Sequence, residues 1–170
     1  VSSVPDPGAT AAWLADLCAH ADGSGLRIAL EYGIFTEVKT LDMACAVLDR
    51  VDHPAKALLI DPIHVDRAGT PLERIAALDP ALLPYAQFCD APAARPDPAD
   101  FAAVITDAID LREQCGAGAL PLADLYRALP AGIPLSIELR SKALREGLPD
   151  PLERARAVAG ATRGWLAGQG

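Results

Sequence analysis

The stretch Leu135-Ser-Ile-Glu-Leu-Arg-Ser-Lys142 has the pattern of a buried strand that ends in a lone carboxylate, Glu138, followed by basic residues. Three earlier apolar runs end in the same way, in Glu31, Asp61 and Gln87. Apolar strands that alternate with amphipathic helices are typical of a parallel sheet covered by helices. The pattern therefore predicts an α/β fold with a parallel sheet.

Helical patterns separate the four runs. The expected strands are Leu26–Tyr32, Ala57–His64, Tyr85–Asp90 and the run from Leu135. The expected helices cover Thr10–His20, the segments that start near Thr40 and Asp97, Pro121–Leu129, and two segments with a Pro-x-Glu start, at Thr70 and Asp150. We expect Phe101 and the apolar residues that follow it to line one face of the helix near Asp97. The order is one helix and then four strand–helix units, which we interpret as a single domain over residues 1–170.

Composition excludes several classes of function. Fifteen Lys and Arg against 23 Asp and Glu give a net charge of -8, so a basic surface for nucleic acid is not expected. The longest runs without charge, such as Ala128–Ile137, are about half the ~20 residues that a membrane span needs. The start of the sequence has no signal-peptide pattern. The 4 cysteines form no paired motif, which favours a reducing, cytoplasmic setting.

The carboxyl ends of parallel strands meet at one edge of a sheet, where functional groups usually gather. Glu31, Asp61, Gln87 and Glu138 all occupy that position. Oxygen donors of this kind suit Mn²⁺ or Mg²⁺ better than Zn²⁺, so we predict these four residues as metal ligands. The alternative is that each faces solvent or caps a helix.

Other polar residues near these strand ends are weaker candidates. His64 follows Asp61 by three residues and could bind metal, act as general acid or base, or be structural. Arg140 could clamp a carboxylate or phosphate of a substrate, or belong to a solvated basic loop. Asp90 and Arg95 are weaker pocket candidates. The two remaining histidines are expected to be structural, His20 in a helix and His53 in a turn.

Four ordered motifs resemble the second half of the sugar phosphate isomerase/epimerase family of xylose isomerase-like TIM barrels. They are Leu-Arg-Ile-Ala-Leu-Glu31, Leu-Leu-Ile-Asp61-Pro-Ile-His64, Tyr-Ala-Gln87-Phe-Cys-Asp90 and Pro-Leu-Ser-Ile-Glu138. The resemblance extends over nearly the whole chain, and its Asp-x-x-His element is the most specific. It implies a barrel whose fifth to eighth strands supply the metal ligands.

The resemblance also implies residue roles. Glu31, Asp61, Gln87 and Glu138 match the metal ligands, and His64 matches a residue that handles protons or substrate. The usual third ligand is His, whereas Gln at this position is similar to the 3-dehydroshikimate dehydratase branch. Many relatives carry Gly-Glu-Gly before the eighth strand. This chain has Gly116-Ala-Gly118, so any role of that Glu is lost.

The implied activity is isomerisation, epimerisation or dehydration of a small polyhydroxylated carbonyl compound. The base would be His64, Glu31 or Glu138. One alternative is a barrel that binds a sugar or a protein partner without catalysis. A second is the abasic-DNA endonuclease branch. That branch needs several zinc ions, more His ligands and a basic groove, and the three histidines and net charge of -8 of this chain argue against it.

Length is the main departure from the family pattern. A full barrel takes about 250 residues and eight strands, and this sequence has 170 residues and four expected strands. Because an isolated half would expose strand edges, we expect either a piece of a longer chain or a half-barrel that pairs with a copy of itself.

Overall fold

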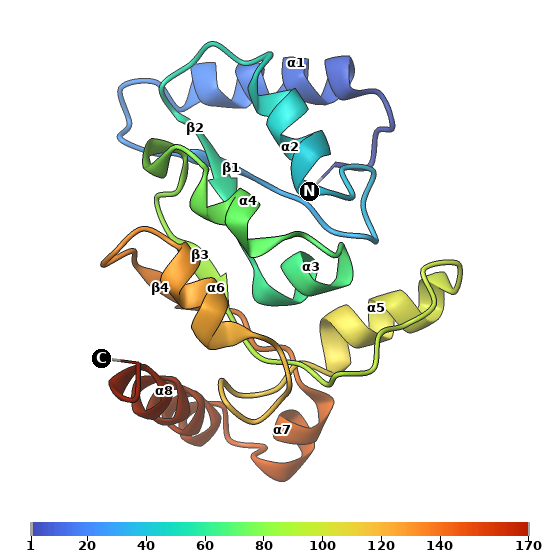
Figure 1. The fold of residues 1–170 in the computed structure, drawn as a ribbon, viewed down its shortest axis with the longest axis vertical. Helices are drawn as coiled ribbons and strands as arrows, with labels where there is room; N and C mark the ends of the chain where they lie inside the picture. Colours follow the sequence, from blue (N-terminus) through green and yellow to red (C-terminus); the bar gives the residue numbers. More distant parts are fainter. Residues whose placement is uncertain (1, 170) are drawn as a thin grey trace.

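Four short parallel strands run through the middle of the fold, with helices around them (Figure 1). This computed structural model describes residues 2–169. The strands are β1 Ile28–Glu31, β2 Lys56–Leu59, β3 Ala86–Phe88 and β4 Leu135–Ile137. The helices are α1 Pro7–His20, α2 Leu41–Leu48, α3 Pro62–Arg67, α4 Leu72–Ala76, α5 Phe101–Asp110, α6 Leu122–Ala128, α7 Lys142–Gly147 and α8 Pro151–Ala167, with a 3-10 turn, η1, at Pro80–Leu82.

The strand order follows the sequence. β1 pairs with β2 and β3 pairs with β4, both in parallel. A parallel bridge between Ile60 and Ala86 joins the two pairs, and the Gln87 N–H donates to the Ile60 carbonyl at 2.9 Å. The order is therefore β1-β2-β3-β4, and the outer edges of β1 and β4 pair with no other strand within residues 2–169. This confirms the predicted α/β fold with four strands of a barrel-type sheet. The described residues do not close a barrel.

Side-chain caps explain where several helices begin. The Asp6 and Asp150 carboxylates accept backbone N–H groups from the first turns of α1 and α8, and each of these helices has a proline as its first residue. The Thr40 hydroxyl caps α2. The sequence predicted all three helices. Their apolar faces and the strands form one core, which includes fully buried Leu58 and Phe88. No helix in the described part of the chain is both long enough and apolar enough to span a membrane.

Two predicted element boundaries were wrong. The second strand was expected to reach His64, but it ends at Leu59 and α3 begins at Pro62. Asp61 is the reason, because its carboxylate caps that helix. Thr70 was expected to cap the next helix. Its hydroxyl lies 3.2 Å from the Tyr32 hydroxyl instead, and α4 begins after Pro71 without a side-chain cap.

The run from Leu135 was expected to be buried, and this was also wrong. β4 is the outer strand of the sheet, so nothing in the described chain covers its free edge, and Ile137 is 37% exposed. The strand stops at Ile137, and α7 begins at Lys142 with the Ser141 hydroxyl as its N-cap. Phe101, expected on the packed face of α5, is 65% exposed, because α5 projects away from the sheet (Figure 1).

Candidate metal centre and active site

The strand register places the four predicted ligands on one face of the sheet. Glu31 is paired with Leu59, two residues before Asp61, so both side chains point to the same side. The Ile60–Ala86 bridge puts the next residues, Asp61 and Gln87, on a common face. Gln87 pairs with Ser136, two residues before Glu138. All four groups therefore meet at the carboxyl end of the parallel strands.

Glu31 and His64 form the first contact of the site. His64 Nε2 lies 3.7 Å from Glu31 Oε1, and the Phe35 ring packs on the imidazole at 5.2 Å between ring centroids. Glu31, Asp61 and His64 each offer one ligand atom, and these three atoms lie within 4.8 Å of one another. The predicted proximity of His64 to the ligand set is thus observed, because α3 starts immediately after β2.

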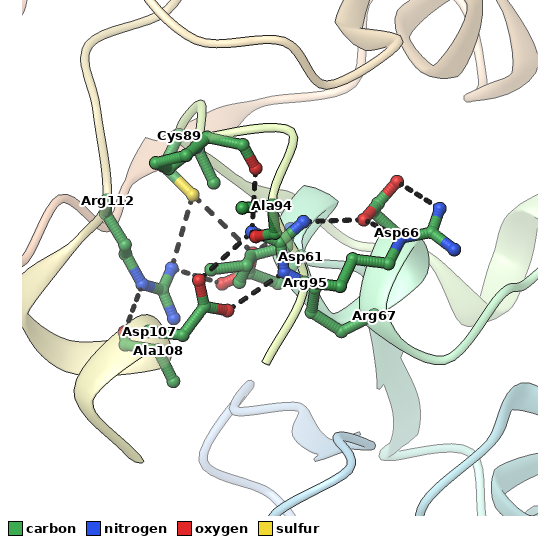
Figure 2. Close-up of polar contacts among 12 residues, drawn as sticks. Asp61, Asp66, Arg67, Cys89, Ala94, Arg95, Asp107, Ala108 and Arg112 are labelled. Atoms are coloured by element: carbon green, nitrogen blue, oxygen red, sulfur yellow. Dashed lines mark hydrogen bonds and ion pairs between the residues drawn. The ribbon is translucent and has the colours of Figure 1, made fainter. Parts of the chain in front are cut away.

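Asp61 is fully enclosed and both of its carboxylate oxygens have donors. Oδ1 accepts the Ile63 N–H at 3.0 Å, which caps α3, and lies 3.8 Å from the Cys89 thiol. Oδ2 accepts from Arg112 Nη1 at 2.6 Å. Because Asp61 is 1% exposed, it would be costly to bury without these donors. Figure 2 shows Arg112 reaching Asp61 beside Cys89.

Gln87 joins the two glutamates. One terminal atom of its amide lies 2.8 Å from Glu31 Oε1 and 3.3 Å from Glu138 Oε2. With nitrogen at this position, the amide donates to both carboxylates. With oxygen there, three oxygens converge, and such an arrangement is repulsive unless a cation lies among them. Amide rotation therefore lets Gln87 serve either a metal-free or a metal-bound site.

Arg112 is the main residue of the site that the sequence analysis missed. It is 4% exposed, and its guanidinium contacts Asp61, Glu138 Oε2 at 3.1 Å, and the Ala108 carbonyl of α5 at 2.7 Å. In the sequence it is one arginine between an apolar helix and a glycine-containing turn, at no strand end. Its role depends on the path of α5, which local patterns do not reveal.

Asp90 is buried, and its carboxylate is hydrogen-bonded by backbone N–H groups. Its carboxylate accepts the N–H groups of Ala91, Gly116 and Leu120 at 2.9 to 3.0 Å. Gly118 fits here because a Cβ would lie 2.4 Å from both Asp90 Oδ1 and the Ala91 carbonyl oxygen. This geometry favours an anchor for the turn after α5 over the predicted contact with substrate, which stays a prediction.

The remaining polar candidates lie outside the cluster. Arg140 is exposed and makes no hydrogen bond or ion pair within residues 2–169, so its role as a substrate clamp stays a prediction. Arg95 binds Asp66 on the surface at 2.9 and 3.0 Å. His20 contacts the Asp16 carbonyl, and His53 accepts the Ala55 N–H. Both histidines thus contact nearby backbone, which fits the structural role expected for them.

Burial and crowding of like charges change the protonation of the cluster. Burial, with Asp61 and Glu138 nearby, raises the pKa of Glu31 to about 7. Burial also raises the pKa of Glu138, with Asp61 acting in the same direction and Arg112 against it. Burial alone would raise the pKa of Asp61, but Arg112 and His64 hold it below its usual value. Burial lowers the pKa of His64, which favours the neutral imidazole.

These donors fit a divalent metal ion. They combine carboxylate oxygens, an amide that can turn its oxygen inward, and a neutral imidazole within 4.8 Å of Glu31 and Asp61. The cluster places three carboxylates, those of Glu31, Asp61 and Glu138, around the single buried guanidinium of Arg112. Of the four predicted ligands, Glu31 and Asp61 lie with His64 in one group of ligand atoms, and Gln87 and Glu138 adjoin it through the contacts of the Gln87 amide. The set Glu31, Asp61, Gln87 and Glu138 as the residues that would hold the ion stays a prediction.

Comparison with known proteins gives the fold a name. No family model matches the sequence, and no curated protein matches it. Several solved structures share the fold, and three of them illustrate it. The IolI protein with a bound zinc atom is 17% identical (TM-score 0.73), and a xylose isomerase-like TIM barrel/4-hydroxyphenylpyruvate dioxygenase fusion protein is 23% identical (0.71). A xylose isomerase domain protein from Alicyclobacillus acidocaldarius subsp. acidocaldarius is 21% identical (0.62).

Coverage is the second result of these comparisons. The matches cover 96%, 98% and 93% of this chain but only 55%, 27% and 59% of the three neighbours, in the same order. The fold is therefore that of a xylose isomerase-like TIM barrel, and the chain spans little more than half of the first neighbour. This confirms the predicted resemblance at the level of fold and the partial barrel.

Proposed function

We propose that this chain carries the metal-binding part of an enzyme that isomerises, epimerises or dehydrates a small polyhydroxylated carbonyl compound. One observation carries the proposal: Glu31, Asp61, Gln87 and Glu138 converge at the carboxyl end of a parallel sheet, with His64 among them. The fold shared with xylose isomerase-like proteins supports it. The substrate class is a sugar, a sugar phosphate or a compound like 3-dehydroshikimate.

The residues divide into binding and proton-transfer groups. A bound divalent ion would polarise the substrate carbonyl and so acidify the neighbouring C–H. Asp61 is ionised and fixed in position by the Ile63 N–H and by Arg112, so it would offer a preoriented carboxylate to the cation. Gln87 can turn its amide oxygen toward the cation without adding charge. Arg140, exposed at the end of β4, is proposed to contact an anionic group of the substrate.

Among the three predicted candidates for the general base, His64, Glu31 and Glu138, Glu31 is the best. In the metal-free chain burial and the neighbouring carboxylates raise its pKa to about 7, and a bound divalent ion would lower it, so the carboxylate would be ionised and ready to accept a proton. His64, 3.7 Å away, is held neutral by burial and can share that proton. Glu138 lies on the other side of Gln87, and its raised pKa makes it a second proton carrier. Two carriers flanking one site suit movement of a proton between two positions of a substrate.

The fate of the substrate decides the reaction. Return of the proton to another carbon or face gives isomerisation or epimerisation, whereas loss of a β-hydroxyl gives dehydration. Gln87 in place of the more usual His slightly favours dehydration. For the metal we propose Mn²⁺ or Mg²⁺ over Zn²⁺, since the donors are mostly oxygen.

A non-catalytic barrel is the second candidate, because Arg112 already pairs with two of the four proposed ligands. Metal analysis of protein purified without chelator separates the two. No affinity for Mn²⁺ would favour the non-catalytic barrel.

The activity test uses the protein in its full natural length, loaded with Mn²⁺. It is assayed on a panel of ketoses, ketose phosphates and 3-dehydroshikimate. We expect turnover of at least one compound, and a loss of about 100-fold or more in kcat for Glu31→Gln and Glu138→Gln. The matched control is Glu146→Gln, an exposed glutamate of α7, which should keep full activity. Equal turnover by wild type and Glu138→Gln would refute the assignment.

A further inference from the structure

A buried arginine lies among the ligands of the proposed metal site. Arg112 Nη1 donates to Asp61 Oδ2 at 2.6 Å, and Nη2 lies 3.1 Å from Glu138 Oε2. The guanidinium is held by the Ala108 carbonyl at Nε and by the Glu138 carbonyl at Nη1. It therefore binds two ligands that come from different strands.

We propose that Arg112 is a built-in counterion that holds Asp61 and Glu138 in place in the metal-free protein and weakens metal binding by competing for them. The inference rests on the proposed metal site. It concerns the strength and regulation of that site.

The geometry of Asp61 makes competition unavoidable. One of its oxygens accepts the Ile63 N–H that starts α3, and the other accepts Arg112. A metal ion bound to Asp61 must share an oxygen with one of these donors or displace it. Displacing Ile63 would uncap α3, so Arg112 is the donor that gives way. A dication placed on the shared oxygen would also lie close to the guanidinium charge and be repelled by it.

Glu138 repeats the conflict on the other side. Its Oε2 lies 3.1 Å from Arg112 Nη2 and 3.3 Å from the Gln87 amide atom. This oxygen faces the Gln87 amide, so it is the oxygen that Glu138 would offer to a cation bound by both residues. Release of Arg112 from Glu138 frees this oxygen, and Ala108 of α5 can retain the guanidinium through Nε.

The chain contains a matched control. Arg67 is buried like Arg112 and pairs with two carboxylates, Asp66 and Asp107, at 2.7 and 2.9 Å. Neither carboxylate is a proposed ligand. Figure 2 shows both guanidinium groups, that of Arg112 beside Asp61 and that of Arg67 beside Asp66 and Asp107. Loss of either arginine removes a buried guanidinium, but only loss of Arg112 should change metal affinity.

The test measures Mn²⁺ binding by calorimetry at one pH, alongside thermal unfolding without metal, for wild type, Arg112→Gln and Arg67→Gln. We expect Arg112→Gln to bind Mn²⁺ at least about tenfold more tightly than wild type. It should also unfold at a lower temperature without metal. Arg67→Gln should unfold at a lower temperature with unchanged Mn²⁺ affinity.

Unchanged or weaker Mn²⁺ affinity in Arg112→Gln, with wild type still binding, would overturn the inference and leave the metal site standing. Absence of Mn²⁺ binding in every variant would overturn the metal site and the inference together. If Arg112→Gln does not fold, Arg112→Lys decides. Its shorter ammonium cannot reach both carboxylates, so it should still bind Mn²⁺ more tightly than wild type, and equal affinity would overturn the inference.

Discussion

Two arginines of this protein, Arg67 and Arg112, are both buried, but the charges around them are balanced in one case and unbalanced in the other. Around Arg67, two guanidinium groups (Arg67 and Arg95) face two carboxylates (Asp66 and Asp107). Around Arg112, one guanidinium faces the carboxylates of Asp61 and Glu138, with Glu31 close by. The first cluster is neutral. The second carries one positive and three negative charges when all are ionised, a net of two negative charges.

The pKa values follow this difference. Burial acts to raise the pKa of Asp66, but its hydrogen bonds to Arg95 and Arg67 hold it below its usual value. In the other cluster burial raises the pKa of Glu31 to about 7 and that of Glu138 in the same direction. A balanced cluster stabilises a fold, whereas an unbalanced one is suited to bind a ligand. The missing charge of the second cluster equals that of one divalent ion.

The largest expected effect is on the balanced cluster. Replacing Arg67 by Met leaves Asp107 buried without its cation and Asp66 with Arg95 alone, and it frees two carbonyls, those of Pro92 and Ala94. We expect a loss of about 3–5 kcal/mol in the free energy of unfolding, measured in urea. Added Mn²⁺ should not restore it. Recovery of stability with Mn²⁺ in this variant would contradict the distinction between the clusters.

Metal should stabilise the unbalanced cluster. At a Mn²⁺ concentration of 100 times Kd, the free energy of unfolding of wild type should rise by about 2.7 kcal/mol, and a chelator should reverse the gain. Differential scanning calorimetry with and without the ion measures this. Asp61→Asn should abolish the gain, while Asp110→Asn, which alters an ion pair with Arg145 beyond the cluster, should keep it.

The unbalanced cluster should also make stability depend on pH. Glu31 has an ordinary pKa near 4.5 when unfolded and about 7 when folded, so the folded chain binds more protons between these values. The contribution of Glu31 to the stability of the metal-free protein should therefore fall by on the order of 1–3 kcal/mol as pH rises from 4.5 to 7. Glu138, whose pKa is also raised, acts in the same direction, and His64, whose pKa is lowered, acts in the opposite direction. Asp61 and Asp66 have lowered pKa values, so their contributions are constant in this window. Measured by urea unfolding, the free energy of unfolding of Glu31→Gln should fall less with rising pH than that of wild type. An unaltered pH dependence would exclude Glu31 as the group responsible.

The smallest effect is expected at the rim of the balanced cluster. Arg95 binds Asp66 with two nitrogens, but its side chain is 58% exposed. Arg95→Ala should cost no more than about 1 kcal/mol, and high salt should reduce the difference from wild type. A cost close to that of Arg67→Met would mean that Arg95 is needed to keep Arg67 in place.

The sequence was informative where function follows strand order. The positions of Glu31, Asp61, Gln87 and Glu138 at strand ends were enough to predict that they meet, because parallel strands present those ends at one edge. The sequence also predicted α1, α2 and α8, whose caps are local. Burial of β4 was predicted wrongly, since its apolar residues do not reveal that it is the outer strand.

Arg112 and Arg67 were missed for a different reason. Each pairs with a carboxylate at least 40 residues away in the chain, so no local pattern connects them. Asp90 is the converse case. Its position after a strand suggested a pocket residue, but the backbone of the turn from Gly116 to Leu120 takes up its carboxylate. Strand-end position indicates where a side chain lies and does not indicate which donors reach it first.

The two carboxylate oxygens of Asp61 have different tasks. One carboxylate oxygen caps α3 and the other accepts from Arg112, so the residue serves folding and, in the proposed function, metal binding. In evolutionary terms, a change at position 61 is exposed to selection through both traits. Drift toward a new activity would have to begin at Glu31, Gln87 or Glu138, whose side chains cap no helix. The site can vary around Asp61 more easily than at it.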